Sequence, residues 1–180
     1  MTPRFALAAI LGGWFLCAAA AEADTFTFEA LPSGTFVVSP GDTVGWGYSI
    51  TNESAVNWLV TTALNANTFL FGTPDASLFD FPVLAPGETV TVLYDPDAHT
   101  GLYAFTADPD MPPDFLNMGF FVLSAEFWTA DPRNGGMFVS MAPDQSAEYS
   151  VTSVPEPSFG LLEAVMLWSL IRRRRYGGAR

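Results

Sequence analysis

A run of alternating residues between positions 44 and 51 limits most strongly the folds that this chain can adopt. Every second position holds a large apolar residue, namely Val44, Trp46, Tyr48 and Ile50, and small or polar residues stand between them. Successive side chains of a β-strand point to opposite faces, so these four apolar side chains would share one face. We therefore predict a strand whose apolar face is buried in a core.

The rest of residues 24–153 also has the pattern of short β-strands. It predicts further strands at residues 26–29, 35–38, 57–64, 89–94, 102–106, 119–128, 137–140 and 147–151. Turn signals rich in Gly and Pro separate them, at residues 40–42, 73–75, 86–88, 95–97 and 134–136. No convincing helical period occurs between residues 24 and 153. This pattern predicts an all-β fold, a single antiparallel β-sandwich over residues 24–153.

One segment is repeated in outline. Ser-Pro-Gly-Asp-Thr-Val at 39–44 returns as Ala-Pro-Gly-Glu-Thr-Val at 85–90, and each precedes an alternating strand that reaches a tyrosine. Pro at the second turn position and Gly at the third are what a type II turn needs. These segments resemble strand entries of bacterial surface Ig-like domains, as Gly-Leu-Tyr-Ala-Phe at 101–105 resembles the start of a later strand. The resemblance implies an Ig-like, Greek-key sandwich and no particular function.

Residues 1–23 have the pattern of a secretory signal peptide. Arg4 supplies a basic start, residues 5–20 are apolar, and small residues before Asp24 supply a cleavage site. The single cysteine, Cys17, lies in this segment, and Leu16 stands where a lipoprotein signal needs a small residue. The exported form is therefore expected to have neither disulfides nor a thiol nucleophile.

Residues 154–180 consist of three parts. Val-Pro-Glu-Pro-Ser at 154–158 comes first, an apolar run at 159–171 follows, and a basic cluster formed by Arg172, Arg173, Arg174 and Arg175 comes next. Proline keeps the first part extended and accessible to a processing enzyme. This order resembles the PEP-CTERM sorting signal of Gram-negative bacterial surface proteins.

The resemblance implies a route and a partner. Such tails are read by exosortase, a membrane-embedded transpeptidase-like enzyme, and the recognition residues here would be Val154, Pro155, Glu156 and Pro157. The apolar run would enter the inner membrane as a short hydrophobic sorting helix, and the arginine cluster would halt it on the cytoplasmic side. Carriers of this tail often accompany exopolysaccharide and biofilm-matrix genes, which implies a place at the cell surface or in the extracellular matrix.

The apolar run is short for a permanent membrane anchor. Thirteen residues span about 20 Å as a helix, against about 30 Å of hydrocarbon. Glu163 within the run is costly at membrane depth. We therefore expect transient insertion, although the sequence leaves open whether the tail is cleaved or retained. The alternative, an amphipathic helix packed on the domain, fits four consecutive arginines poorly.

The charge of the chain is strongly negative. The formal net charge is −12, there is no lysine, and Arg133 is the one basic residue between the two terminal signals apart from the lone histidine. A surface of this kind repels nucleic acid and anionic lipid. We therefore expect no nucleic-acid partner.

The search for catalytic groups gives little. His99 is the lone histidine, so one chain can build neither a histidine triad nor a multi-histidine zinc site. No phosphate-binding Gly-rich loop or nucleophile elbow is present. Paired carboxylates could perform glycoside hydrolysis, but the acids lie in turns beside prolines. We expect a protein that is not an enzyme and has no obligatory cofactor.

Two features could bind a ligand. Asp108, Asp110 and Asp114 lie in a proline-stiffened loop and could offer oxygen ligands to Ca²⁺, although the spacing is not that of an EF-hand. Trp128 precedes a polar loop and is a candidate sugar-stacking residue, whereas Trp46 and Trp58 are expected in the core.

Two hypotheses result. The first is a non-enzymatic exported surface or matrix protein, sorted by exosortase and associated with exopolysaccharide. The second is a secreted carbohydrate-binding or Ca²⁺-assisted, lectin-like module that uses Trp128. The ligand and the oligomeric state are left open.

Overall fold

The computed structural model describes residues 24–154. The predicted signal peptide (1–23), the recognition residues Pro155, Glu156 and Pro157, and the arginine cluster lie outside the described residues. Eleven strands and one short 3-10 turn, η1 (Pro132–Asn134), make up the regular structure of this part of the chain. The strands are β1 (Phe26–Leu31), β2 (Thr35–Val38), β3 (Thr43–Asn52), β4 (Trp58–Ala66), β5 (Gly72–Asp75), β6 (Val83–Leu84), β7 (Thr89–Val92), β8 (Tyr103–Ala107), β9 (Leu116–Trp128), β10 (Phe138–Met141) and β11 (Gln145–Ser153).

The prediction of an all-β protein is confirmed. Each of the nine predicted strands coincides with an observed strand. The sequence did not predict β5, because Thr73-Pro74-Asp75 has the composition of a turn, or β6, because two residues are too few to show a period. Within residues 24–154, no helix has the length and apolar character needed to cross a membrane.

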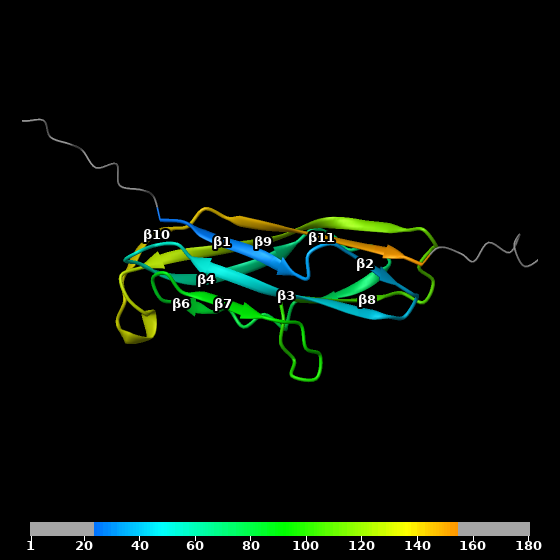
Figure 1. Ribbon diagram of the computed structural model, residues 1–180, viewed down its shortest axis with the longest axis horizontal. Coiled ribbons are helices and arrows are strands. Elements are labelled where there is room, and N and C mark those ends of the chain that lie inside the picture. Colours follow the sequence, from blue (N-terminus) through cyan, green and yellow to red (C-terminus); the bar gives the residue numbers. More distant parts are fainter. Residues whose placement is uncertain (1–23, 155–180) are drawn as a thin grey trace, which may run out of the picture.

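The strands form two sheets (Figure 1). In the first sheet β3 is central, with β1 on one side and β7 and β8 pairing with its two halves; β5 continues the sheet beyond β8. In the second sheet the order is β2-β11-β9-β4-β6, and β10 pairs with the end of β9. The first seven strands alternate between the two sheets.

The expectation of purely antiparallel sheets is wrong for one pair. β2 runs parallel to β11, with Thr35 opposite Ser150 and Val38 opposite Ser153. The cause is local: after β1 the chain leaves the first sheet at Leu31 and, without reversing direction, joins the edge of the second. A pattern of alternation fixes which residues share a face but not the direction of the neighbouring strand.

The repeated turns are built alike. Gly41 and Gly87 have φ of 85° and 71°, so the positive φ that a type II turn requires is present at the third position. Asp42 and Glu88 each donate a backbone N–H to the residue three positions earlier, at 3.0 and 3.1 Å. Their carboxylates accept the N–H of that same residue in return, at 2.9 and 2.7 Å. Each turn therefore holds the start of its strand from both sides.

The two sheets meet through aromatic side chains. Trp46, Tyr48 and Ile50 of β3 are fully buried, as predicted, and Val44 packs against the same core. The Trp46 ring contacts Phe121 and Tyr149 of the second sheet edge-on, with centroids 5.3 and 5.9 Å apart. Edge-to-face pairs of this kind add to the gain from burial.

The molecule is elongated along its strands, and its described ends lie far apart (Figure 1). Asp24 accepts a hydrogen bond from the Asn57 side chain, beside the start of β4, whereas the backbone N–H of Val154 bonds to Val38 at the far end of β2. The thirteen residues of β9 span about 40 Å between these ends. This arrangement places the beginning of the predicted sorting tail at one end of the second sheet.

Candidate functional site

The outer face of the second sheet carries the candidate site. Along β9, residues 117, 121, 123, 125 and 127 are buried in the core. The alternate side chains point outward, and they are Leu116, Met118, Phe120, Val122, Ser124, Glu126 and Trp128. Most of these outward side chains are apolar, although a sheet face that contacts water does not need apolar side chains.

Trp128 lies at one end of this face. Its direct neighbours across the sheet are Trp58 on β4 and Phe138 on β10, so three aromatic residues stand in one row on adjacent strands. The Trp128 ring is half-buried, and Phe138 meets it at a centroid distance of 6.1 Å with the planes at 85°. The indole N–H donates to Glu126 Oε2 at 3.0 Å, which fixes the ring's orientation.

The expectation that Trp46 and Trp58 both belong to the core is half right. Trp46 is buried, but Trp58 is half-buried and lies in the outer row beside Trp128. A bulge between Thr61 and Ala63 shifts the register of β4, so the inward residues before and after it differ in parity. Sequence alternation gave no sign of this shift.

The loop that follows Trp128 is held in one shape. The Asp131 carboxylate accepts the N–H of Arg133 at 2.8 Å and caps η1, and Gly135 follows with φ of 87°. A Cβ on Gly136 would lie 2.0 Å from the Ala130 carbonyl oxygen, so this position requires glycine. The Arg133 side chain is exposed, and it is the one Lys or Arg side chain among residues 24–154.

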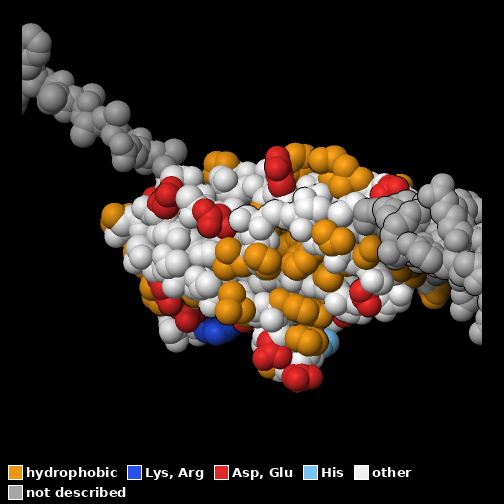
Figure 2. Space-filling view, turned by 45° about the vertical axis from the view of Figure 1, so that its right-hand side comes forward, with side chains coloured by type: hydrophobic (Ala, Val, Ile, Leu, Met, Phe, Trp, Pro, Cys, Tyr) orange, Lys and Arg blue, Asp and Glu red, His pale blue; other side chains and the backbone are white. Residues whose placement is uncertain are grey.

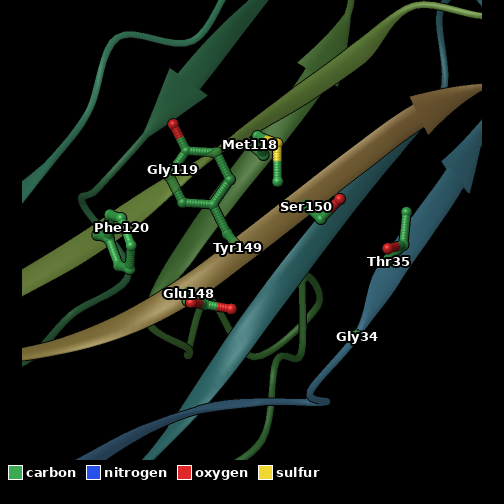
Figure 3. Close-up of a pocket in the computed structure, with 8 residues that line it drawn as sticks. All are labelled: Gly34, Thr35, Met118, Gly119, Phe120, Glu148, Tyr149 and Ser150. Atoms are coloured by element: carbon green, nitrogen blue, oxygen red, sulfur yellow. The ribbon is translucent and has the colours of Figure 1, made fainter.

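The opposite end of the same face contains an open groove of about 480 Å³ (Figure 3). Its walls come from β2, β9 and β11, with Met118 and Phe120 as apolar walls and Thr35, Glu148 and Ser150 as polar ones. The Tyr149 ring leaves the groove for the core and lies over Gly119, where a Cβ would come within 2.8 Å of the ring. The sequence search missed this groove because its residues come from three strands distant in sequence.

The predicted calcium loop is a structural corner. Met111 between the aspartates is buried, and its N–H donates to the Asp108 carbonyl at 3.1 Å. The Ser153 hydroxyl donates to the Pro112 carbonyl at 2.7 Å and fastens the loop to β11. In the described part of the chain no group of three or more His, Cys, Asp or Glu side chains is placed to hold a metal ion, so Asp108, Asp110 and Asp114 are not brought together.

His99 lies at the tip of the loop after β7, with φ of 55°. Its Nε2 is 3.4 Å from the Ser77 hydroxyl, and Ser77 also donates its backbone N–H to Asp75 at 2.8 Å. That backbone hydrogen bond, with smaller contributions from the Ser77 hydroxyl and from His99, holds the pKa of the exposed Asp75 carboxyl below its usual value. All three residues are exposed, so the arrangement is a contact on the surface of the molecule.

A shielded phenol lies at the edge of the core. The Tyr48 hydroxyl donates to Asp80 Oδ1 at 2.5 Å, and Phe79 packs edge-on against the Tyr48 ring at 5.0 Å. Burial, followed by the hydrogen bond to Asp80, raises the pKa of Tyr48. Burial likewise raises the pKa values of Tyr103 and Tyr149. The rings of all three tyrosines belong to the core or pack against it.

Comparisons with known proteins add little. No protein-family model and no curated protein matches the chain. Among solved structures it is similar to the VesB protease of Vibrio cholerae, at 11% identity over 72% of this chain and 31% of that one, with a TM-score of 0.35. It is also similar to a family 123 glycoside hydrolase from Clostridium perfringens, at 15% identity over 69% and 23%, with a TM-score of 0.18. The chain spans less than a third of each, and likenesses this distant carry no argument about activity.

Proposed function

We propose that this chain is a non-enzymatic exported protein of the cell surface or extracellular matrix, delivered by the signal peptide at 1–23 and sorted through the tail at 154–180. An exosortase-type membrane enzyme would recognise Val154, Pro155, Glu156 and Pro157. The tail would insert transiently in the membrane, and the mature domain would associate with exopolysaccharide.

We also infer that residues 24–153 form a single Ig-like, Greek-key β-sandwich. The support is the alternation of the first seven strands between the two sheets. Because neither sheet can be assembled from a continuous half of the chain, two separate domains are a poor description. The aromatic contacts between the sheets give the shared core that a sandwich requires.

One observation supports the proposal of a sorted tail: the last described strand, β11, ends directly before the sorting motif. Ser153 is the last residue of β11, and Val154 makes one further backbone bond, to Val38 at 3.0 Å. Pro155 follows directly. A cut within or after Pro155-Glu156-Pro157 would therefore remove none of the eleven described strands and none of the described core residues.

Mass spectrometry of the chain produced with and without an exosortase tests this proposal. With the enzyme, we expect a secreted form that begins at Asp24 and ends close to Pro157. A double substitution, Pro155→Ala with Pro157→Ala, should leave the tail in place, whereas Pro143→Ala in the turn before β11 should be cut normally. An intact tail in membranes despite an active exosortase would contradict the proposal.

A second candidate function is carbohydrate binding, and the aromatic row of Trp58, Trp128 and Phe138 favours it. Sugars pack their apolar faces on aromatic rings, and the perpendicular Trp128 and Phe138 rings offer two walls of a corner, with the Glu126 carboxylate bonded to the Trp128 indole. Binding of exopolysaccharide by residues 24–157, measured with and without Ca²⁺, tests it. Trp128→Ala should abolish binding, and Phe120→Ala, at the other end of the face, should not. Equal binding by both variants would exclude the row as the site.

A further inference from the structure

Glu126 is the one charged residue among the outward residues of β9, and its neighbours across the sheet are apolar. It lies opposite Val60 on β4 and opposite Met141 on β10. The next outward row along these three strands is the aromatic row. Met141 is 60% exposed, so water or a ligand has access to this part of the face. This end of the face therefore combines an aromatic row with a carboxylate set among apolar side chains.

The Glu126 carboxylate and the Trp128 ring form one unit. The indole N–H donates to Oε2 at 3.0 Å, so the carboxylate lies at the edge of the ring. A carboxylate has two oxygens with about four lone-pair positions, and this bond uses one of them. A sugar that packs on the indole would therefore have its ring substituents within reach of a carboxylate that can accept further hydrogen bonds.

The charge of the domain discriminates between classes of sugar. Asp and Glu side chains far outnumber Arg133, the one Lys or Arg side chain of residues 24–154. Figure 2 shows acidic side chains spread over one face of the molecule. A polysaccharide of uronic acids would be repelled by such a surface, whereas one that carries free amino groups would be attracted to it.

We infer that the aromatic row and Glu126 bind a polysaccharide of amino sugars whose amino groups are free and protonated. This inference rests on the carbohydrate-binding function proposed above and names its ligand class. The apolar face of one sugar ring packs on Trp128, and the ammonium group of the sugar donates to the Glu126 carboxylate. Hydrogen bonds between charged groups are about twice as strong as neutral ones, so an ammonium is preferred there over a hydroxyl or an acetamide.

The groove end of the same face supplies a matched carboxylate. Glu148 on β11 lies directly opposite Phe120 on β9, so it also stands beside an exposed aromatic residue. Phe120 has no N–H that could hold the carboxylate at the edge of its ring. A substitution of Glu148 therefore removes the same charge from the same face without changing the aromatic row.

Calorimetric titration of the full, unmodified chain tests the ligand class. The probes are glucosamine oligomers, the same oligomers in N-acetylated form, and galacturonate oligomers of equal length. The titration is done at about pH 5.5, where sugar amino groups and protein carboxylates are both largely charged. Salt at about 0.15 M limits the attraction of distant carboxylates to about 8 Å.

We expect the free glucosamine oligomer to bind at least about fivefold more tightly than its acetylated form, because one neutral hydrogen bond becomes a charged one. The galacturonate oligomer should bind most weakly. Equal affinity for the two glucosamine forms, or tightest binding of galacturonate, would overturn the inference and leave the carbohydrate-binding function in place.

Glu126→Gln separates the charge from the position of the ring. The amide oxygen of glutamine can accept the indole N–H, so binding of the acetylated oligomer should change less than about twofold. The preference for the free amine should fall at least about threefold. Glu148→Gln loses the same charge and should keep the preference. Equal losses in the two variants would indicate general attraction by an acidic surface and would contradict the inference.

The remaining outcomes distinguish the proposals. Absence of binding by all three oligomers would overturn both the carbohydrate-binding function and this inference, whereas the sorting proposal has its own test by mass spectrometry. Tighter binding of oligolysine than of the glucosamine oligomer, lost in Glu126→Gln, would assign the site to a basic peptide and overturn the inference.

Discussion

The outer faces of the two sheets differ in chemistry although the same alternation builds both. On the first sheet, hydroxyl side chains face each other across the strands, with Thr51 and Thr89 at 2.9 Å, Ser49 and Thr91 at 3.1 Å, and Thr43 and Thr106 at 2.9 Å. On the second sheet the outward positions of β9 hold Leu, Met, Phe, Val and Trp together with one Ser and one Glu. The hydroxyl groups of the first face form hydrogen bonds with one another. The apolar side chains of the second face cannot do so, and we therefore place the proposed carbohydrate contact there.

The middle of the first face is also closed by the protein itself. Gly45 and Gly47 point outward from β3 and are buried, because Tyr94 and the chain at residues 92–94 cross over them. A Cβ at Gly45 would lie 2.2 Å from the Tyr94 ring. The parts of the chain that follow the two repeated segments therefore fit together. Residues 92–94, after the second segment, cover Gly45 and Gly47, which follow the first.

The largest effect is expected from the core that both faces share. Trp46→Ala should lower the free energy of unfolding by about 3–5 kcal/mol, because it removes a fully buried ring that touches both sheets. The Trp46 Nε1 has no hydrogen-bond partner among the described residues, so Trp46→Phe, which removes that donor, should cost much less. Urea unfolding followed by circular dichroism measures both. Two separate transitions, one for each sheet, would show that the sheets are independent.

The next effect should appear at the closed centre of the first face. Gly47→Ala places a Cβ 2.2 Å from the Val92 carbonyl oxygen, and backbone cannot move aside as a side chain can. We expect a loss of about 1–3 kcal/mol in thermal or urea unfolding. Ser49→Ala, one outward position further along β3, is the control and should change stability by about 0.5 kcal/mol or less. A stable Gly47→Ala variant would mean that Tyr94 and its neighbours do not cover this face.

The strands and turns of the first sheet could be predicted from the sequence, but the exposed apolar side chains of the second sheet could not. The alternation of apolar and polar residues predicted nine strands. The geometry of the two Pro-Gly turns could also be predicted, because a turn depends on only four adjacent residues. Alternation cannot tell which of two apolar faces is the covered one. The pattern therefore predicts Trp58 in the core and does not identify Met118 and Phe120 as exposed.

The groove and the parallel pair were beyond sequence reasoning for a related reason. Thr35, Met118 and Glu148 come together only through the order of strands in the sheet, which depends on many weak contacts distant in sequence. The three aspartates of the loop at 108–114 show the opposite case. They are close in sequence, but they do not form a group of three possible metal ligands in the described residues, and the loop is bonded to β11 through Ser153.

A smaller effect should appear at alkaline pH. Burial raises the pKa values of Tyr48, Tyr103 and Tyr149 in the folded state, so above about pH 10 the unfolded chain loses phenol protons that the folded chain retains. The contribution of these phenols to stability should therefore be constant below about pH 9 and fall as the pH rises beyond 10. Tyr48→Phe should lose about 1–2 kcal/mol at pH 7, because the bond to Asp80 is gone, and show a shallower alkaline decline. An unchanged pH profile in Tyr48→Phe would remove Tyr48 from this account.

The smallest change in stability is expected when the chemistry of the two faces is exchanged. In chains of residues 24–157, Met118→Thr with Phe120→Thr gives the second face hydroxyls, and Thr51→Val with Thr89→Val gives the first face methyl groups. Each pair should alter the free energy of unfolding by about 0.5 kcal/mol, because the first removes side chains that already contact water and the second removes both partners of one hydroxyl pair. Thermal melting is the measurement. A loss above about 2 kcal/mol in the threonine pair would mean that Met118 and Phe120 belong to the core of the domain. Retained stability would mean that the second face is apolar for contact with something other than the domain, since the fold itself gains nothing from leaving those side chains in water.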